Sequence, residues 1–416
     1  PGGGVASPPS FLKGVPPLAP AGKVAATRET GLLDIGEVDF GNGVKALLYP
    51  TDSEPGRVSV KVRFGRGYRA FAPAEAPYIA LGDRALVASG EATLGAEEID
   101  RISTGRKLGF DFTIEDAAFQ FFAETRQADL ADQLYLFAAK FAHPRWDANP
   151  VQRAMAAQRI EYDAYAASPQ GVLARDLAFY SNGQDPRWRI ATPAETQAAT
   201  PDGFRKAWER VLGQGPIEVQ VYGDIDREAT IEALRKTFGA LAPRKPLPAL
   251  PAGTGKPVAA PAAPIVLTHR GDADQAAAVL TWNTGGGMDG VRESRQLYIL
   301  AEVFQNRLLD AIRQKMGASY SPVVQADWPL DQPGGGTIRA IAQVKPADVP
   351  LFYATARKIA ADLIAAPPSA DEIERVTERT SPDTMQALAQ RYLAPDKGWE
   401  LSVVPQAAGE GGAAAR

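Results

Sequence analysis

One stretch of the sequence combines side chains that can bind a peptide carbonyl or an oxyanion. Leu308 and Ile312 place an apolar stripe on a predicted helix, and Gly317 is a typical left-handed stop for it. Arg313 then lies in the last turn, and Tyr320 begins the returning strand. A guanidinium and a phenol on one side of this turn could hold a carbonyl oxygen or stabilise negative charge on it. The alternative is structural: the arginine complements the helix dipole and the tyrosine is an ordinary strand residue.

A self-contained metal site is absent from the sequence. A histidine-based zinc site needs two His at positions i and i+4 of one helix face, plus a carboxylate. The chain has two His, His143 and His269, far apart, and no Cys. His143 precedes Pro144 after a predicted helix and caps its C-terminal end, and His269 lies at a predicted strand edge. This composition excludes a Cys-ligated metal site and a thiol nucleophile, and it disfavours Ser-His-Asp catalysis.

The segment Gly285–Gly290 matches G-x-G-x-x-G after a predicted strand and before a predicted helix. A dinucleotide fold needs a parallel strand next, ending in an acid about 20 residues on. Asp310 stands at that distance, but it falls inside the predicted helix, and a strand pair follows. We therefore predict a glycine turn and keep nucleotide binding as the weaker alternative.

Composition and charge exclude further classes of function. The 416 residues include 45 Lys and Arg against 49 Asp and Glu, a net charge of −4, which disfavours nucleic acid and anionic membranes as main partners. No run approaches the ~18 apolar residues of a membrane span. The Pro- and Ala-rich start suits a bacterial envelope protein after signal removal. We therefore expect a periplasmic location, with the cytoplasm as the alternative.

Proline content divides the chain. Residues 243–264 hold 7 Pro in 22 positions and form a predicted stiff linker. The linker separates a first domain over 31–242 from a second over 265–416. Residues 1–30 show no periodicity and are predicted to form an extended arm.

The two domains repeat one order of elements: a strand, a glycine turn, a helix, a strand pair, a helix, and a helix that leads into a last strand. Matching segments are 58–64 with 276–282, 110–125 with 320–344, 128–130 with 347–349, and 200–222 with 381–404. Thr-Pro-Asp at 200–202 and Ser-Pro-Asp at 381–383 are strong helix starts. The pattern predicts an α+β fold of two homologous repeats, each an antiparallel sheet covered by helices on one face and joined by the Pro-rich linker.

The repeats differ in length. Ala128 corresponds to Ala347, 219 residues on, whereas Thr200 corresponds to Ser381, 181 residues on. The second repeat is therefore 38 residues shorter (219 − 181), near Glu372–Thr380. Either this stretch was deleted in evolution or the sequence leaves out a disordered piece. We favour the second, because the predicted helix there has no Gly or Pro terminator.

The block Arg313-x-x-x-Gly317-x-x-Tyr320 resembles the R-x-x-x-G-x-x-Y segment in the C-terminal half of the pitrilysin/insulinase family of zinc peptidases, which includes mitochondrial processing peptidase. The run Leu300–Leu308 is similar to the family's sequence before that helix. The duplicated repeat and the Pro-rich connector also match, and the resemblance covers about residues 35–405.

The resemblance implies a shell of four homologous domains, in which one half carries the zinc motif H-x-x-E-H and the other supplies an Arg/Tyr pair. The corresponding helix here, Tyr78–Val87, has no His and no Glu, so this chain is expected to bind no metal and to be inactive alone. It would be the substrate-binding subunit of a heterodimeric zinc endopeptidase. Arg313 and Tyr320 would support the substrate and the transition state, zinc would lie in the homologous partner, and the substrate would be a peptide or unfolded polypeptide. The alternative is a structural or assembly protein with this fold and no peptidase role.

Overall fold

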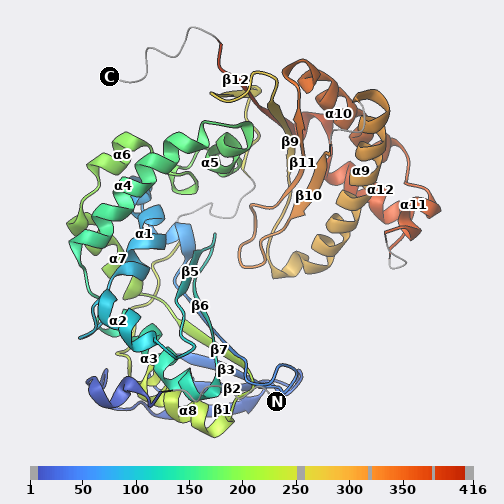
Figure 1. The fold of residues 1–416 in the computed structure, drawn as a ribbon. Coiled ribbons are helices and arrows are strands. Elements are labelled where there is room, and N and C mark those ends of the chain that lie inside the picture. Colours follow the sequence, from blue (N-terminus) through green and yellow to red (C-terminus); the bar gives the residue numbers. More distant parts are fainter. Residues whose placement is uncertain (1–7, 251–257, 317–320, 377–379, 408–416) are drawn as a thin grey trace. The chain divides into compact units, whose positions relative to one another are not determined.

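The computed structural model describes residues 8–250, 258–316, 321–376 and 380–407. The chain divides into two compact units, which are described in turn (Figure 1). The first unit consists of Pro1–Arg159 and Ala191–Ala249, and the second of Ile160–Ile190 and Leu250–Arg416.

The first unit is built on a seven-stranded sheet. Its strands are β1 (Val24–Glu29), β2 (Gly36–Phe40), β3 (Lys45–Pro50), β4 (Val58–Phe64), β5 (Asp111–Ile114), β6 (Phe119–Thr125) and β7 (Ile217–Gly223). They lie in the order β1-β2-β3-β7-β4-β6-β5, and each neighbouring pair is antiparallel except β3 and β7. In β6 every second residue is buried, the alternation of a sheet with one covered face.

Helices cover that face. The unit contains α1 (Ala76–Ala88), α2 (Ala96–Ser103), α3 (Leu130–Ala142), the start of α4 (Ala148–Tyr165), α6 (Pro193–Ala198), α7 (Pro201–Leu212) and α8 (Arg227–Lys236). Aromatic side chains of the sheet pack under α1, α3 and α7, and Trp208 lies 5.3 Å from Phe119 between ring centroids. The predicted start of α7 is confirmed, because the Thr200 side chain accepts a hydrogen bond from the Gly203 N–H at 3.0 Å.

The described part of the N-terminal arm lies on α3. The Ser10 hydroxyl and the Phe11 N–H donate to the carboxylate of Asp132, and the Tyr135 hydroxyl donates to the Pro16 carbonyl at 3.1 Å. The sequence predicts an extended arm over residues 1–30. Its end forms the strand β1, which pairs with β2 at the sheet edge, since backbone pairing there does not need an apolar pattern in the sequence.

The second unit has a five-stranded sheet. Its strands are β8 (Ile265–His269), β9 (Ala276–Asn283), β10 (Val323–Asp327), β11 (Thr337–Val344) and β12 (Gly398–Pro405), and its helices are α5 (Pro169–Ser181), α9 (Val291–Met316), α10 (Val349–Ala365), α11 (Ala370–Glu374) and α12 (Pro382–Tyr392). The strand order is β10-β11-β9-β12-β8, antiparallel except for β12 and β8. Helices α9, α10 and α12 cover one face of this sheet (Figure 1).

The duplication is confirmed by topology. The order β3-β7-β4-β6-β5 in the first unit is the order β8-β12-β9-β11-β10 in the second. One pair in each sheet departs from the predicted antiparallel pattern, because β3 pairs with β7 and β8 with β12 in parallel. These partners lie far apart in the sequence, and a long connection is what a parallel pair requires. Local pattern alone does not reveal it.

Residues 160–190 depart from the expected domain division. They were assigned to the first domain, over 31–242, whereas they group with the second unit. The reason is an apolar face on α5: Val172 and Leu177 pack against Val279 on the second face of the five-stranded sheet. The second repeat has only α11 between α10 and α12, and residues 377–379 lie outside the described residues. The origin of the shorter second repeat therefore stays open.

Candidate functional site

Arg313 lies where the sequence predicts it, in the last turn of α9, with its side chain exposed. The helix is fixed beneath it by buried residues at helical spacing, among them Phe304, Leu308 and Ile312. Gly317 and Tyr320 lie outside the described residues. The structure therefore provides the position of the guanidinium, and the pairing of Arg313 with Tyr320 stays a prediction.

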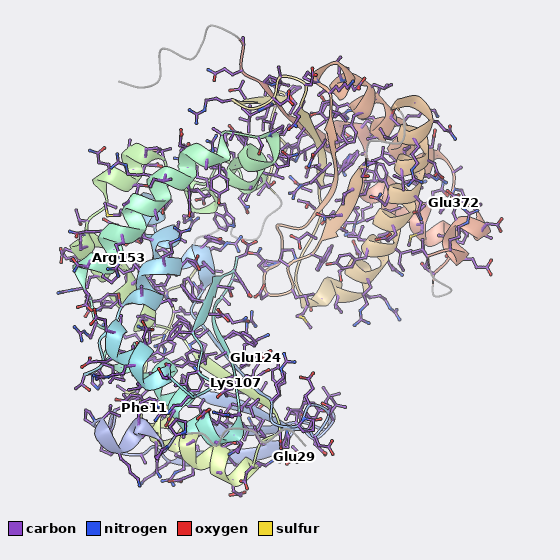
Figure 2. The ribbon with its side chains drawn as sticks, viewed as in Figure 1. Phe11, Glu29, Lys107, Glu124, Arg153 and Glu372 are labelled. Carbon is purple, nitrogen blue, oxygen red and sulfur yellow. The ribbon has the colours of Figure 1, made fainter. Side chains whose placement is uncertain are left out.

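Polar contacts hold the second half of α9 to the helices beside it. Arg307 donates to both carboxylate oxygens of Glu372 on α11, at 2.6 and 3.0 Å (Glu372 is labelled in Figure 2). These hydrogen bonds lower the pKa of Glu372 to about 2. Lys315 donates to the Thr355 hydroxyl on α10 at 3.4 Å. The end of α9 that carries Arg313 is thus anchored on two sides.

The chain returns from α9 into β10, the edge strand of the sheet. The side chain of Gln305 on α9 donates to the Pro322 carbonyl at 2.8 Å and accepts from the Val324 N–H at 2.5 Å. Beside β10, α9 and the strand enclose a groove of about 480 Å³, which Tyr298 and Glu302 line from the helix. Sequence reasoning missed Gln305. The available signal was an amide side chain next to the apolar stripe of α9, where a polar group needs a partner.

Helix α1 occupies the place expected for a metal motif, and its residues do not fit a zinc ion. The segment Tyr78–Val87 has one ionisable acid, Asp83, whose pKa is raised by partial burial. Gly82 faces Trp208 so closely that a Cβ there would lie 2.0 Å from the indole ring. Trp208 also donates to the Tyr78 carbonyl at 2.8 Å. This face of α1 is therefore filled by packing, with no room for a ligand side chain at Gly82.

Within the described ranges, no three His, Cys, Asp or Glu side chains come together as a metal site would require. His143 caps the C-terminal end of α3, as predicted, and its ring lies 3.2 Å from the Leu18 carbonyl. His269 is buried in β8, with its Nδ1 accepting from the Gly271 N–H and its Nε2 donating to the Gln275 carbonyl. Both histidines have structural roles in this arrangement.

A buried ion pair lies just after α1. Lys140 on α3 is fully buried and lies 2.7 Å from the Glu91 carboxylate, and it also donates to the Ser89 carbonyl at 2.6 Å. Burial lowers the pKa of Lys140 and raises the pKa of Glu91, because removal from water disfavours both charged forms. The pair fastens the end of α1 to α3, and it is closed to solvent, so we assign it to stability.

The glycine segment 285–290 is a structural turn. Trp328 packs against it and donates to the Gly287 carbonyl at 3.0 Å, and a Cβ on Gly290 would lie 2.1 Å from that ring. The strand before the turn, β9, has antiparallel neighbours, β11 and β12. A dinucleotide fold requires parallel ones. The glycines are thus explained by close packing.

Comparison with protein families found one match. Residues 198–379 match the family model described as the peptidase M16 inactive domain, and this range includes α9 and Arg313. This part of the chain is similar to the M16 peptidases. The resemblance to the pitrilysin/insulinase peptidases is thereby confirmed, and the matched model describes a domain of the family that is not catalytic.

Solved structures of two proteases and of a peptidase M16 inactive domain share the fold. PqqL, a periplasmic protease from Escherichia coli, is 13% identical with a TM-score of 0.76, and the match covers 92% of this chain and 47% of PqqL. A mutant of the ferredoxin protease FusC in complex with Arabidopsis ferredoxin is 14% identical, with a TM-score of 0.72 over 96% of this chain and 48% of FusC. A peptidase M16 inactive domain from Pseudomonas fluorescens is 15% identical, with a TM-score of 0.71 over 90% of this chain and 99% of that protein.

The chain therefore spans about half the length of PqqL and FusC. At these identities the likeness establishes the fold alone. A search of curated protein sequences found no match. Among the described helices, none combines the length and apolar character needed to cross a membrane.

Proposed function

We propose that this chain is the non-catalytic, substrate-binding subunit of a heterodimeric zinc endopeptidase. Its homologous partner carries the zinc, and this chain supplies Arg313 and Tyr320 to the partner's site. The substrate is a peptide or an unfolded polypeptide, bound in part through the edge strands of the sheets. By itself the chain hydrolyses nothing.

One combination of observations carries the proposal. Helix α1 has no zinc-ligand set and is closed by Trp208, while Arg313 stands exposed at the end of a firmly anchored helix. An arginine kept in solvent at a helix end is free to donate its planar N–H groups to a substrate carbonyl. The match to the M16 inactive domain supports the same division of roles.

The chemistry follows from these roles. Zinc bound by the partner would activate water for attack on the peptide carbonyl. The guanidinium of Arg313 would hold the substrate backbone near the scissile bond, and the phenol of Tyr320 would donate to the oxygen that becomes negatively charged. Neither Arg313 nor Tyr320 has to gain or lose a proton in these steps, because an arginine stays protonated and a phenol donates in its neutral form.

The test is reconstitution. The chain is purified together with a homologue that carries H-x-x-E-H, and cleavage of a quenched fluorescent peptide is measured. Tyr320→Phe should lower kcat by about 100-fold, the effect of removing one oxyanion donor, and Arg313→Ala should lower kcat/KM because the substrate backbone loses a donor. Arg295→Ala is the matched control, since Arg295 is also an exposed arginine on α9. It should leave cleavage unchanged.

Two results would contradict the proposal. Full activity of the complex with both variants would favour the structural or assembly role. Chelator-sensitive cleavage by the chain alone would show that it holds its own metal. We extend the proposal to a periplasmic location, on the basis of the similarity to PqqL. Cell fractionation of the native host tests this directly.

A further inference from the structure

The edge strand β10 presents backbone groups that lack a strand partner. It pairs with β11 on one side, and no other described strand lies on its second side. The Val324 N–H donates to the side chain of Gln305 on α9, so the backbone N–H of residue 324 points away from β11. Along an antiparallel strand, the N–H and C=O groups of successive residues point alternately toward one neighbouring strand and toward the opposite side. The N–H and C=O of Ala326 therefore also face outward, and within the described ranges they have no hydrogen-bond partner.

Gln305 closes one end of this edge. Its amide occupies the outward Pro322 carbonyl and the outward Val324 N–H, at 2.8 and 2.5 Å. A side-chain amide has the same donor and acceptor as a backbone peptide group. It therefore takes the place of one residue of an added strand. A peptide laid along β10 must stop at this point.

A groove of the right shape continues from that stop. Tyr298, Ala301 and Glu302 line it from α9, at seven, four and three residues before Gln305. That spacing places all four side chains on one side of the helix. The seven residues from Tyr298 to Gln305 span about 10 Å of helix. An extended peptide covers that length with about three residues.

The charges in the groove favour a basic side chain. Glu302 is exposed, and no described residue forms an ion pair with it. Asp327 also lines the groove, and its carboxylate interacts electrostatically with Arg339. Arg339 also lines the groove, where it offsets Asp327, and it donates to the hydroxyls of Thr281 and Ser181 at 3.3 and 3.0 Å. An incoming lysine or arginine would meet an uncompensated carboxylate at Glu302.

The geometry points to a peptide-binding groove between β10 and α9, in which about three residues of an extended polypeptide add to the sheet at Ala326, end at Gln305 and direct a basic side chain to Glu302. This inference deepens the proposed function and rests on it for the role of the bound peptide. It names the subsite and the preferred residue. An extended chain can satisfy the outward N–H and C=O of one residue together.

Backbone binding is tested on the full chain by fluorescence anisotropy. The probe is a fluorescein-labelled 10-residue peptide of alternating Thr and Lys. Ala326→Pro removes the outward N–H and leaves the ladder to β11 intact, since that N–H does not serve the ladder. It should weaken binding about five- to tenfold, the loss of one hydrogen bond and of close approach. Ala326→Ser keeps the N–H and should bind like wild type. Equal affinity of both variants overturns the inference.

Charge preference is tested without altering the backbone. Glu302→Lys should reverse the preference, so that a Thr/Glu peptide binds better than the Thr/Lys peptide. Glu374→Lys, an exposed acid of the same unit on α11, is the control and should keep the original preference. An unchanged preference in the Glu302 variant counts against the site, as does a wild-type chain that binds neither peptide.

Separate outcomes test what occupies the groove and whether the proposed function is correct. If sedimentation shows a wild-type dimer that Ala326→Pro dissociates, a second copy fills the groove and the peptide inference fails. If peptide binding follows the predicted pattern but Arg313→Ala leaves a reconstituted complex fully active, the groove stands and the proposed function fails. Loss of cleavage in the Arg313 variant, together with unaltered peptide binding in the Ala326→Pro chain, supports the proposed function and contradicts the groove.

Discussion

The buried ion pair between α1 and α3 offers a sharp test of how the first unit is held together. Lys140→Met removes a fully buried cation that lies 2.7 Å from the Glu91 carboxylate and donates to the Ser89 carbonyl. Breaking a buried pair from one side costs about 3–5 kcal/mol, because the remaining charge has no water around it. The free energy of unfolding of this unit should therefore fall by about 4 kcal/mol.

The variant should also respond to pH in a defined direction. Burial already raises the pKa of Glu91, and without Lys140 no cation opposes the shift. At a pH above the ordinary glutamate pKa, Glu91 then stays protonated in the folded state but is ionised in the unfolded state. The deficit of Lys140→Met should thus grow as pH rises above about 4.5, the ordinary value, and shrink as pH falls toward it. The double variant with Glu91→Met should recover most of the stability.

Hydrogen exchange read on peptides from α3 separates this unit from the rest of the chain. A loss of about 4 kcal/mol corresponds to exchange about a thousandfold faster, at roughly 1.4 kcal/mol for each factor of ten. Lys206→Met is the control, since that lysine is 72% exposed in a surface pair with Asp202, and it should change exchange by less than about threefold. An acceleration below tenfold in Lys140→Met, or no recovery in the double variant, would refute the reasoning.

Two more predictions concern packing and ion pairing. Gly82→Ala should destabilise the first unit by about 1–3 kcal/mol, because the new Cβ meets the Trp208 ring; Gly14→Ala, with open space around it, is the control in the same urea titration. Glu372→Gln should lower the melting temperature of the second unit at neutral pH. Because the pKa of Glu372 is lowered to about 2, its ionised carboxylate stabilises the fold at pH values above the ordinary pKa of 4.5. This contribution is lost as the pH falls toward 2. The deficit relative to wild type, about 1–2 kcal/mol after solvent screening, should vanish in melts near pH 2, and a deficit independent of pH would exclude the ion pair with Arg307 as its cause.

Much of the architecture was predictable because its signals are local. The alternation over 58–64 produced β4 at those residues, and Thr-Pro-Asp at 200–202 produced the start of α7. Each signal depends on a few neighbouring residues, through side-chain period or helix capping. The absence of His and Glu from 78–87 is likewise a matter of residue type alone. Since a zinc site of this kind needs those ligands, the residue types exclude one from this helix.

Other features depended on residues far apart in the chain. The placement of α5 on the second sheet rests on Val172 meeting Val279, and the parallel pairing of β8 with β12 joins segments separated by most of the second repeat. In the sequence, Gln305 is an ordinary polar helix residue. Only the structure shows that its amide oxygen accepts from the Val324 N–H. Such contacts depend on which surfaces remain uncovered when the elements pack, and sequence period carries no record of that.

The sequence by itself thus determined the duplicated α+β plan, the helix that carries Arg313 in its last turn, and the lack of a metal-ligand set on α1, since local spacing and residue type decide each of these. The tertiary structure alone decided that Trp208 fills the face of α1 at Gly82, that residues 160–190 join the second unit, and that β10 keeps an open edge beside Glu302. Packing selects among the arrangements that local signals allow, because burial of apolar area and pairing of backbone groups are satisfied only by the whole fold.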